Sequence, residues 1–362
     1  MELRALYYPS DESNLKAVKE NGLYLQYIEK QTEELCMTAV QQNPRAIKFV
    51  KKQTENICLF VVQQNGDLLQ HIYEPTEAVL LQAVKNEGLA LKYVLFPSHE
   101  ICMAAVKQNG LYLQYIEKQT EELCMTAVQQ NPRAIKFVKK QTENICLFVV
   151  QQNGDLLQHI YEPTEAVLLQ AVKNEGLALK YVLFPSHEIC MAAVKQNGFA
   201  LQYVKNQCLK ICETAVQTHA LAIKYVKYQT TELCLSAIKK NGLAIQNIRA
   251  PTEAMKLIAI EKNPMAIQFI EQPSNTLCDV AVRLRPYAIQ FLKRADEALW
   301  LEALVRKPNV IQFLDFYSET LLKTALKLSP SSFKYIPEAF KTQNICQFAM
   351  ERAVNIQRHF PE

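Results

Sequence analysis

Hydrophobic residues recur along the chain with a fixed period of 22 residues. In the repeat that begins at Thr32, apolar residues stand at positions 4, 5, 8 and 9, namely Leu35, Cys36, Ala39 and Val40. This spacing forms one stripe of an amphipathic α-helix and does not fit the alternation of a strand. A second apolar group follows at positions 15, 16 and 19 of each repeat. The pattern therefore predicts two helices in every repeat.

The polar residues mark where each helix begins. Position 1 is usually Thr or Ser and is followed by acidic residues, as in Thr32, Glu33 and Glu34, which predicts an N-cap with carboxylates in the first turn. Position 13 holds all eight glycines, and six other repeats have proline there. Because proline fixes φ near −65°, position 13 cannot require a left-handed backbone. We predict that it starts the second helix, with Asn at position 12 as its N-cap, and that the two helices have about ten and seven residues.

The repeat frame predicts an all-α fold: an α-solenoid, or superhelix, of about sixteen 22-residue helix-turn-helix units. We interpret residues 1–362 as a single repeat array, with residues 1–9 as a half unit and N-terminal cap. Residues 10–251 form near-consensus units and residues 252–339 form diverged units. Residues 340–362 form an irregular C-terminal capping unit. The leucine-rich repeat, the main rival architecture, is rejected because no unit contains its LxxLxLxxN strand pattern.

Residues 21–110 recur without a change at residues 109–198, an offset of four repeats. A catalytic site needs unique residues in one geometry, whereas an array that can grow by four repeats suggests a distributed binding surface. The duplication therefore favours a binding role over an enzymatic one.

The strings AVKQNGFALQYV (193–204) and AVKNEGLALKYV (83–94) resemble the repeats of the domain of unknown function 4116 family. These tandem helical units are abundant in giant viruses of amoebae and are also found in some bacteria. The resemblance covers essentially the whole chain and weakens after about Asp296. It implies a helical array of viral type and brings no established activity or catalytic residue.

Composition and charge narrow the classes of partner. The chain has 40 basic and 36 acidic residues and a net charge of +4, which gives no strong field for phosphate backbones or anionic membranes. No apolar run approaches the length of a membrane span, and the segment before Ser10 lacks the features of a signal peptide. We therefore expect a cytoplasmic protein with no membrane partner, in the host cytoplasm if the chain is viral.

Ten of the eleven cysteines stand at position 5 of their repeats. They could form a thiol ladder for metal or redox chemistry, but we favour the interpretation that they are small buried hydrophobes, since Leu80 and Leu168 occupy the same column. The pairs Cys208 with Cys212 and His99 with Cys102 each lack a second pair nearby in sequence for a zinc site. We predict no metal site and no cofactor.

Position 17 is the candidate binding site, because it is Gln or Lys in fifteen repeats and is mostly followed by an aromatic residue. Stacked repeats would turn it into a ladder of long polar side chains flanked by rings, able to hold an extended peptide or single-stranded RNA. The structural alternative is that the rings fill space between repeats while Gln and Lys bridge to a neighbouring turn or face water. The ladder comprises Gln26, Lys48, Gln70, Lys92, Gln114, Lys136, Gln158, Lys180, Gln202, Lys224, Gln246, Gln268, Gln290, Gln312 and Lys334.

From these patterns we expect a scaffold without a catalytic residue that binds a protein or peptide along one face of the superhelix. The alternative is single-stranded nucleic-acid binding through the same ladder, which the near-neutral charge disfavours. None of the six histidines lies beside a plausible catalytic partner in the sequence, and we find no HExxH, GxSxG or phosphate-binding glycine loop.

Overall fold

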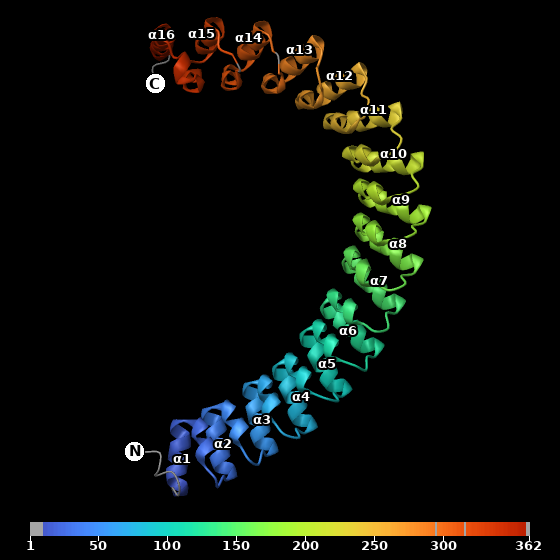
Figure 1. Ribbon diagram of the computed structural model, residues 1–362, viewed down its shortest axis with the longest axis vertical. Helices are drawn as coiled ribbons and strands as arrows, with labels where there is room; N and C mark the ends of the chain where they lie inside the picture. The colour runs from blue at the N-terminus through green and yellow to red at the C-terminus, as the bar shows by residue number, and fades with distance from the viewer. Residues whose placement is uncertain (1–9, 294, 315, 360–362) are drawn as a thin grey trace. The chain divides into compact units, whose positions relative to one another are not determined.

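The computed structural model describes residues 10–293, 295–314 and 316–359, with side chains up to Arg352. These residues belong to two compact units, Met1–Asn174 and Glu175–Glu362, called here the first and second compact units. Each repeat pairs an α-helix with a short 3-10 helix, and no strand occurs in the described ranges. Within each compact unit, successive helix pairs lie side by side (Figure 1). The predicted all-α repeat fold is confirmed.

The first helix of each repeat is an α-helix of ten residues. These helices are α1 (Asp11–Glu20), α2 (Glu33–Gln42), α3 (Glu55–Gln64), α4 (Glu77–Asn86), α5 (His99–Gln108), α6 (Glu121–Gln130), α7 (Glu143–Gln152), α8 (Glu165–Asn174), α9 (His187–Gln196), α10 (Leu209–Thr218), α11 (Thr231–Lys240), α12 (Glu253–Lys262), α13 (Asn275–Leu284), α14 (Glu297–Arg306) and α15 (Glu319–Leu328). The last, α16 (Gln343–His359), is longer.

The second helix is a 3-10 helix of six residues, which differs from the expected seven. These helices are η2 (Gly22–Tyr27), η3 (Pro44–Phe49), η4 (Gly66–His71), η5 (Gly88–Tyr93), η6 (Gly110–Tyr115), η7 (Pro132–Phe137), η8 (Gly154–His159), η9 (Gly176–Tyr181), η10 (Gly198–Tyr203), η11 (Ala220–Tyr225), η12 (Gly242–Asn247), η13 (Pro264–Phe269), η14 (Pro286–Phe291), η15 (Pro308–Phe313) and η16 (Pro330–Tyr335). A further short helix, η17 (Glu338–Phe340), precedes α16.

In the repeat that begins at Thr32, called here repeat 2, capping explains where the two helices begin and end. The Thr32 hydroxyl accepts the N–H of Leu35 at 3.3 Å and opens α2, as predicted. Asn43 then closes α2 by donating its N–H to the carbonyl of Ala39 at 2.9 Å. Its side-chain oxygen accepts the N–H of Arg45 at 3.1 Å and opens η3. One residue therefore joins the two helices, and the predicted Asn N-cap is confirmed.

Adjacent repeats approach closely at position 13. Gly110 has a negative φ, and a Cβ added to it would lie 2.1 Å from the carbonyl oxygen of Ala127 in the next repeat. Its N–H donates to Oε1 of Gln130, also in the next repeat, at 2.6 Å. Glycine is used here for close backbone approach, and the fully buried alanine at position 8 supplies the other side of the contact.

Glutamines at position 22 connect six of the repeats to the repeat that follows. The Gln141 side chain donates to the carbonyls of Ile135 at 3.2 Å and His159 at 2.9 Å, and it accepts the N–H of Tyr161 at 2.9 Å. The last two partners belong to the following repeat. We call such a residue a glutamine clamp. Six repeats carry a clamp, formed by Gln31, Gln53, Gln119, Gln141, Gln207 and Gln229.

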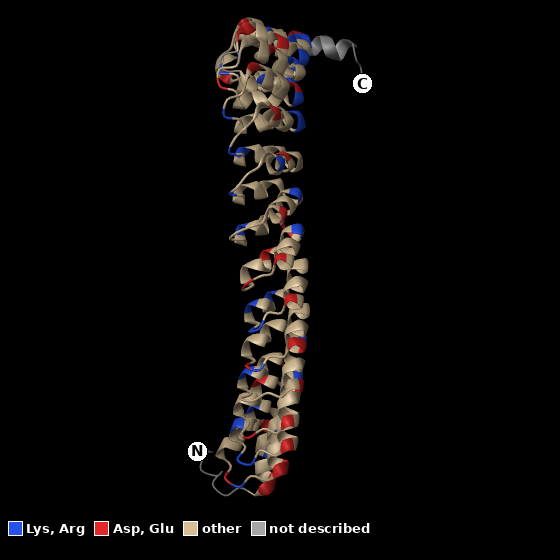
Figure 2. Cartoon of the chain, turned by 90° about the vertical axis from the view of Figure 1, so that its right-hand side faces the viewer, with Lys and Arg blue, Asp and Glu red and all other residues tan. Residues whose placement is uncertain are grey.

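The predicted half unit at residues 1–9 and residues 360–362 of the predicted capping unit lie outside the described residues. In the first compact unit, acidic first turns recur along the stacked α-helices and are coloured red in Figure 2. No helix among the described residues has both the length and the apolar character needed to cross a bilayer.

Candidate functional site

The fifteen predicted ladder residues, called here the position-17 row, are all exposed. Their placement follows from the 3-10 geometry, which has three residues per turn. Positions 13 and 16 face inward: the glycines at position 13, such as Gly22, and Leu25 at position 16 are buried, while the prolines at position 13 are half-buried. Position 17 lies one residue further round the helix and points to solvent. Neighbouring 3-10 helices contact each other, for example η2 with η3 and η3 with η4, so the row runs from repeat to repeat within each compact unit.

Five of the nine glutamines of the row bond within their own repeat. The Gln158 amide donates to the carbonyl of Asp155 three residues earlier, at 3.0 Å. The same bond to position 14 occurs in four other repeats, at Gln70, Gln202, Gln268 and Gln290. Unlike the glutamine clamps, these bonds do not join one repeat to the next.

The lysines of the row lie over the aromatic ring that follows them. The Lys48 Nζ is 4.7 Å from the ring centroid of Phe49, and Lys92 is 4.5 Å from that of Tyr93. The other four lysines of the row make the same contact at 4.6–5.7 Å, namely Lys136, Lys180, Lys224 and Lys334. A cation over a ring face is attracted by the ring quadrupole, so these ammonium groups have a preferred position at the surface.

The rings at position 18 differ in exposure, and three of the six rings beside glutamines are half-buried. Three rings beside glutamines are open to solvent: Tyr27 is 54% exposed, Tyr115 42% and Phe269 39%. Rings beside lysines, such as Phe49 and Tyr93, are half-buried. Most of the rings are half-buried and the Gln and Lys side chains face water, an arrangement that the structural alternative considered from the sequence also describes.

Lys92 also contacts the repeat before it. Its Nζ lies 3.2 Å from a carboxylate oxygen of Asp67, and the Tyr93 hydroxyl donates to the same carboxylate at 2.9 Å. The hydrogen bond from Tyr93 and the charge and hydrogen bond of Lys92 hold the pKa of Asp67 below its usual value. The positive charge of Lys92 is therefore compensated by a carboxylate of the same chain.

The cysteines at position 5 are largely buried, as expected. Eight of the ten are buried, and the other two, Cys278 and Cys346, are half-buried. Burial raises the pKa of the Cys58 thiol, as it does for the other buried cysteines of the column. Only Cys208 at position 1 of its repeat is exposed.

Across the described ranges, no three His, Cys, Asp or Glu side chains gather in a way that could hold a metal ion. Of the pairs singled out in the sequence, His99 lies 3.6 Å from a Glu122 carboxylate oxygen, and Cys102 is buried.

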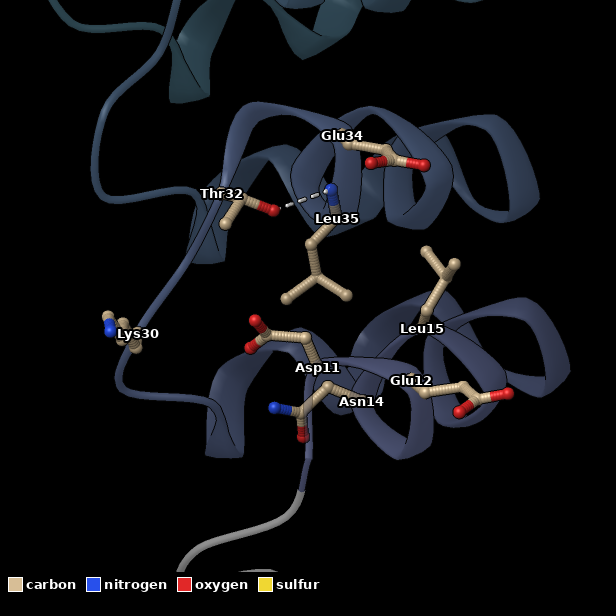
Figure 3. A pocket seen from close by; sticks show the side chains of 8 residues that line it. All are labelled: Asp11, Glu12, Asn14, Leu15, Lys30, Thr32, Glu34 and Leu35. Atoms are coloured by element: carbon tan, nitrogen blue, oxygen red, sulfur yellow. Dashed lines mark hydrogen bonds between the residues drawn. The ribbon is translucent and has the colours of Figure 1, made fainter.

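A pocket of about 320 Å³ lies between α1 and α2 (Figure 3). Leu15 and Leu35 supply its apolar lining, and Thr32 lies at its edge with its hydroxyl on the Leu35 N–H. The remaining lining residues are polar or charged, namely Asp11, Glu12, Asn14, Lys30 and Glu34. No residue of the position-17 row lines this pocket, so it is separate from the candidate site.

Sequence reasoning missed the glutamine clamps, which are structural, and it missed the contact of each row lysine with its own ring. The sequence does contain a signal for the clamps. Position 22 holds two glutamines, then two prolines, and this order repeats along the chain.

The chain matches no curated protein. It does match the family model described as Domain of unknown function (DUF4116), over residues 14–54, 98–142, 120–164 and 165–208. Two of the four matched stretches overlap, and each spans about two repeats, as expected for tandem units. The resemblance seen in the sequence is confirmed over these stretches, the last of which ends at residue 208.

Proposed function

We propose that the protein is a non-catalytic scaffold that binds a protein or peptide along the position-17 row. One observation carries this proposal: the row presents an exposed Gln or Lys in each of fifteen repeats. Its glutamine bonds stay within one repeat, while the glutamine clamps join one repeat to the next. The row side chains are therefore available to an extended ligand that lies across successive 3-10 helices.

The burial of the position-5 thiols supports a scaffold that is not an enzyme. A nucleophilic cysteine needs a lowered pKa, because the thiolate is the reactive form. Burial instead raises the pKa of the position-5 thiols, for example Cys58 and Cys124, and keeps them protonated. Their burial also keeps them away from a substrate.

Single-stranded nucleic acid is the second candidate, favoured by the open rings of Tyr27 and Tyr115, on which bases could stack. The distribution of charge favours the peptide, since Asp67 occupies the same surface and neutralises Lys92. A phosphate backbone crossing these repeats would meet this carboxylate.

Affinity capture tests the proposal. The tagged full chain is used to capture partners from its native cells, with and without nuclease, and bound proteins are identified by mass spectrometry. One variant carries Gln26→Ala and Gln114→Ala in the row. Its matched control carries Gln41→Ala and Gln129→Ala, two exposed glutamines on α2 and α6.

We expect a protein partner that survives nuclease, binds the control and is reduced by the row variant. Equal loss from both variants, or a partner that disappears with nuclease, would show that the row is not a protein-binding surface.

A further inference from the structure

Two identical sets of tyrosines and cations lie on the 3-10 helices of the first compact unit. In each set, one repeat supplies two tyrosines and the next repeat supplies an arginine and a lysine. We call these sets the basic-tyrosine sites. The first consists of Tyr24, Tyr27, Arg45 and Lys48 on η2 and η3, and the second of Tyr112, Tyr115, Arg133 and Lys136 on η6 and η7.

The two helices of each basic-tyrosine site are in contact. Both η2 with η3 and η6 with η7 pack against each other, so the tyrosines and cations of one site lie on two adjacent 3-10 helices. In the first site, Tyr24 is 42% and Tyr27 is 54% exposed. The rings of Tyr112 and Tyr115 in the second site lie with centroids 6.4 Å apart and are tilted by 39°. Each site thus offers apolar ring surface and hydroxyl donors beside two positive charges.

The cations of a site form a pair. Arg45 and Lys48 are three residues apart in a 3-10 helix, so they lie on the same edge, separated by about 6 Å along the helix axis. Both are exposed, and neither makes an ion pair within the part of the chain that the structure describes. The ammonium of Lys48 has a preferred position over Phe49, so less conformational freedom is lost when a ligand binds it.

The repeats between the sites differ in charge. There, the cation of the row is Lys92, which is compensated by Asp67 at 3.2 Å. Within the first compact unit, the row cations that make no ion pair among the described residues are therefore Lys48 and Lys136, four repeats apart. With about 8–10 Å for each packed layer, the sites are separated by roughly 30–40 Å.

This spacing indicates the chemistry of the ligand. A nucleic-acid strand carries a phosphate every few ångströms and would place negative charge against Asp67 as well as against the cations. An extended peptide can carry carboxylates opposite the cations and uncharged residues opposite Asp67. Guanidinium groups bind carboxylates with two parallel hydrogen bonds, and tyrosine rings can cover the aliphatic parts of acidic side chains.

We propose that the two basic-tyrosine sites bind two acidic segments of one extended polypeptide partner, separated by at least about ten residues of chain. This inference rests on the proposed function, since it names the partner of the same surface. Binding at both sites together makes the second contact intramolecular and raises the overall affinity.

The test uses labelled peptides with two tetraglutamate clusters joined by Gly-Ser spacers, measured by fluorescence anisotropy on the full-length protein. A spacer of about 6 residues reaches at most about 21 Å, whereas one of about 20 residues can reach about 70 Å. A peptide with a single tetraglutamate cluster and an oligouridylate strand complete the set of probes. We expect the long-spacer peptide to bind at least about tenfold more tightly than the single-cluster peptide.

The short-spacer peptide should gain no such advantage. Equal binding of the short-spacer and long-spacer peptides would contradict the two-site arrangement. Tighter binding of the oligouridylate than of the long-spacer peptide would contradict the acidic-polypeptide ligand.

Variants of one site give the matched control. Arg45→Gln with Lys48→Gln should reduce the affinity for the long-spacer peptide to that of the single-cluster peptide, and so should the same change at the second site. Lys19→Gln with Lys107→Gln removes the same charge from exposed α-helix positions and should have no effect. Circular dichroism checks that each variant is folded.

The outcome also separates this inference from the scaffold proposal. If a captured native partner still binds a variant that lacks both basic-tyrosine sites, the acidic-segment inference is wrong. The scaffold proposal then stands on the rest of the row.

Discussion

Replacing Gln141 by alanine tests whether the glutamine clamps hold adjacent repeats together. The substitution removes two donated bonds, to the carbonyls of Ile135 and His159, and one accepted from the N–H of Tyr161. A hydrogen bond of this kind contributes about 1 kcal/mol net, and the side chain is half-buried, so water replaces only part of what is lost. We therefore expect the free energy of unfolding to fall by about 2 kcal/mol.

The exposed Gln158 in the same compact unit provides a matched control. It has the same side chain and bonds only within its own repeat, to the carbonyl of Asp155. Gln158→Ala should change the free energy of unfolding by less than about 0.5 kcal/mol. Urea denaturation followed by far-ultraviolet circular dichroism measures both variants. Because Gln53 makes the same bonds four repeats earlier, Gln53→Ala combined with Gln141→Ala should cost about twice as much.

The reasoning would be refuted if Gln158→Ala cost as much as Gln141→Ala, because the loss would then not depend on contacts between repeats. It would also fail if Gln141→Ala left the unfolding midpoint unchanged.

Three further predictions concern other parts of the repeat. Gly110→Ala should destabilise the protein by about 1–3 kcal/mol in the same urea assay, because its Cβ would lie 2.1 Å from the carbonyl oxygen of Ala127; a neutral result would show that the repeats can separate freely. Asp67 has a lowered pKa in the folded state, so its stabilising effect is complete above its usual pKa and is lost as the pH falls through the lowered value. The difference in urea midpoint between wild type and Asp67→Asn should accordingly shrink on acidification, and a difference that grows would contradict the ion pair with Lys92. Iodoacetamide applied to the folded protein should label Cys208 first, with the site read by peptide mass spectrometry; equally fast labelling of the position-5 cysteines would contradict their burial.

The sequence predicted the parts of the fold that depend on local chemistry. The caps at Thr32 and Asn43 and the small residue at position 8 each act within one turn or through size alone, so their roles follow from residue type. The 3-10 character of the second helix was missed, although the inward-facing positions 13, 16 and 19 are spaced by three. In repeat 2 these positions are Pro44, Ile47 and Val50, a spacing that suits three residues per turn.

The residues of the candidate site were chosen from the sequence, but their contacts were not predicted. Exposure of the row follows from the position-17 pattern once the helix is placed. The ring contact of Lys48 with Phe49 could not be foreseen, because consecutive residues on a helix do not normally face each other. The clamp formed by Gln141 depends on backbone atoms of the next repeat, and their positions are set by stacking.

The order of the clamps along the chain records how the array lengthened. From Gln31 onward, position 22 holds two glutamines and then two prolines, and this order occurs three times before it ends at Pro273. The third occurrence begins at Gln207, outside the identical copy, and many of its other positions have changed. A block of four repeats was therefore copied in an earlier event as well as in the recent one. The unit of evolutionary growth is this four-repeat block, because copying it whole keeps each clamp before the neighbour that it fits.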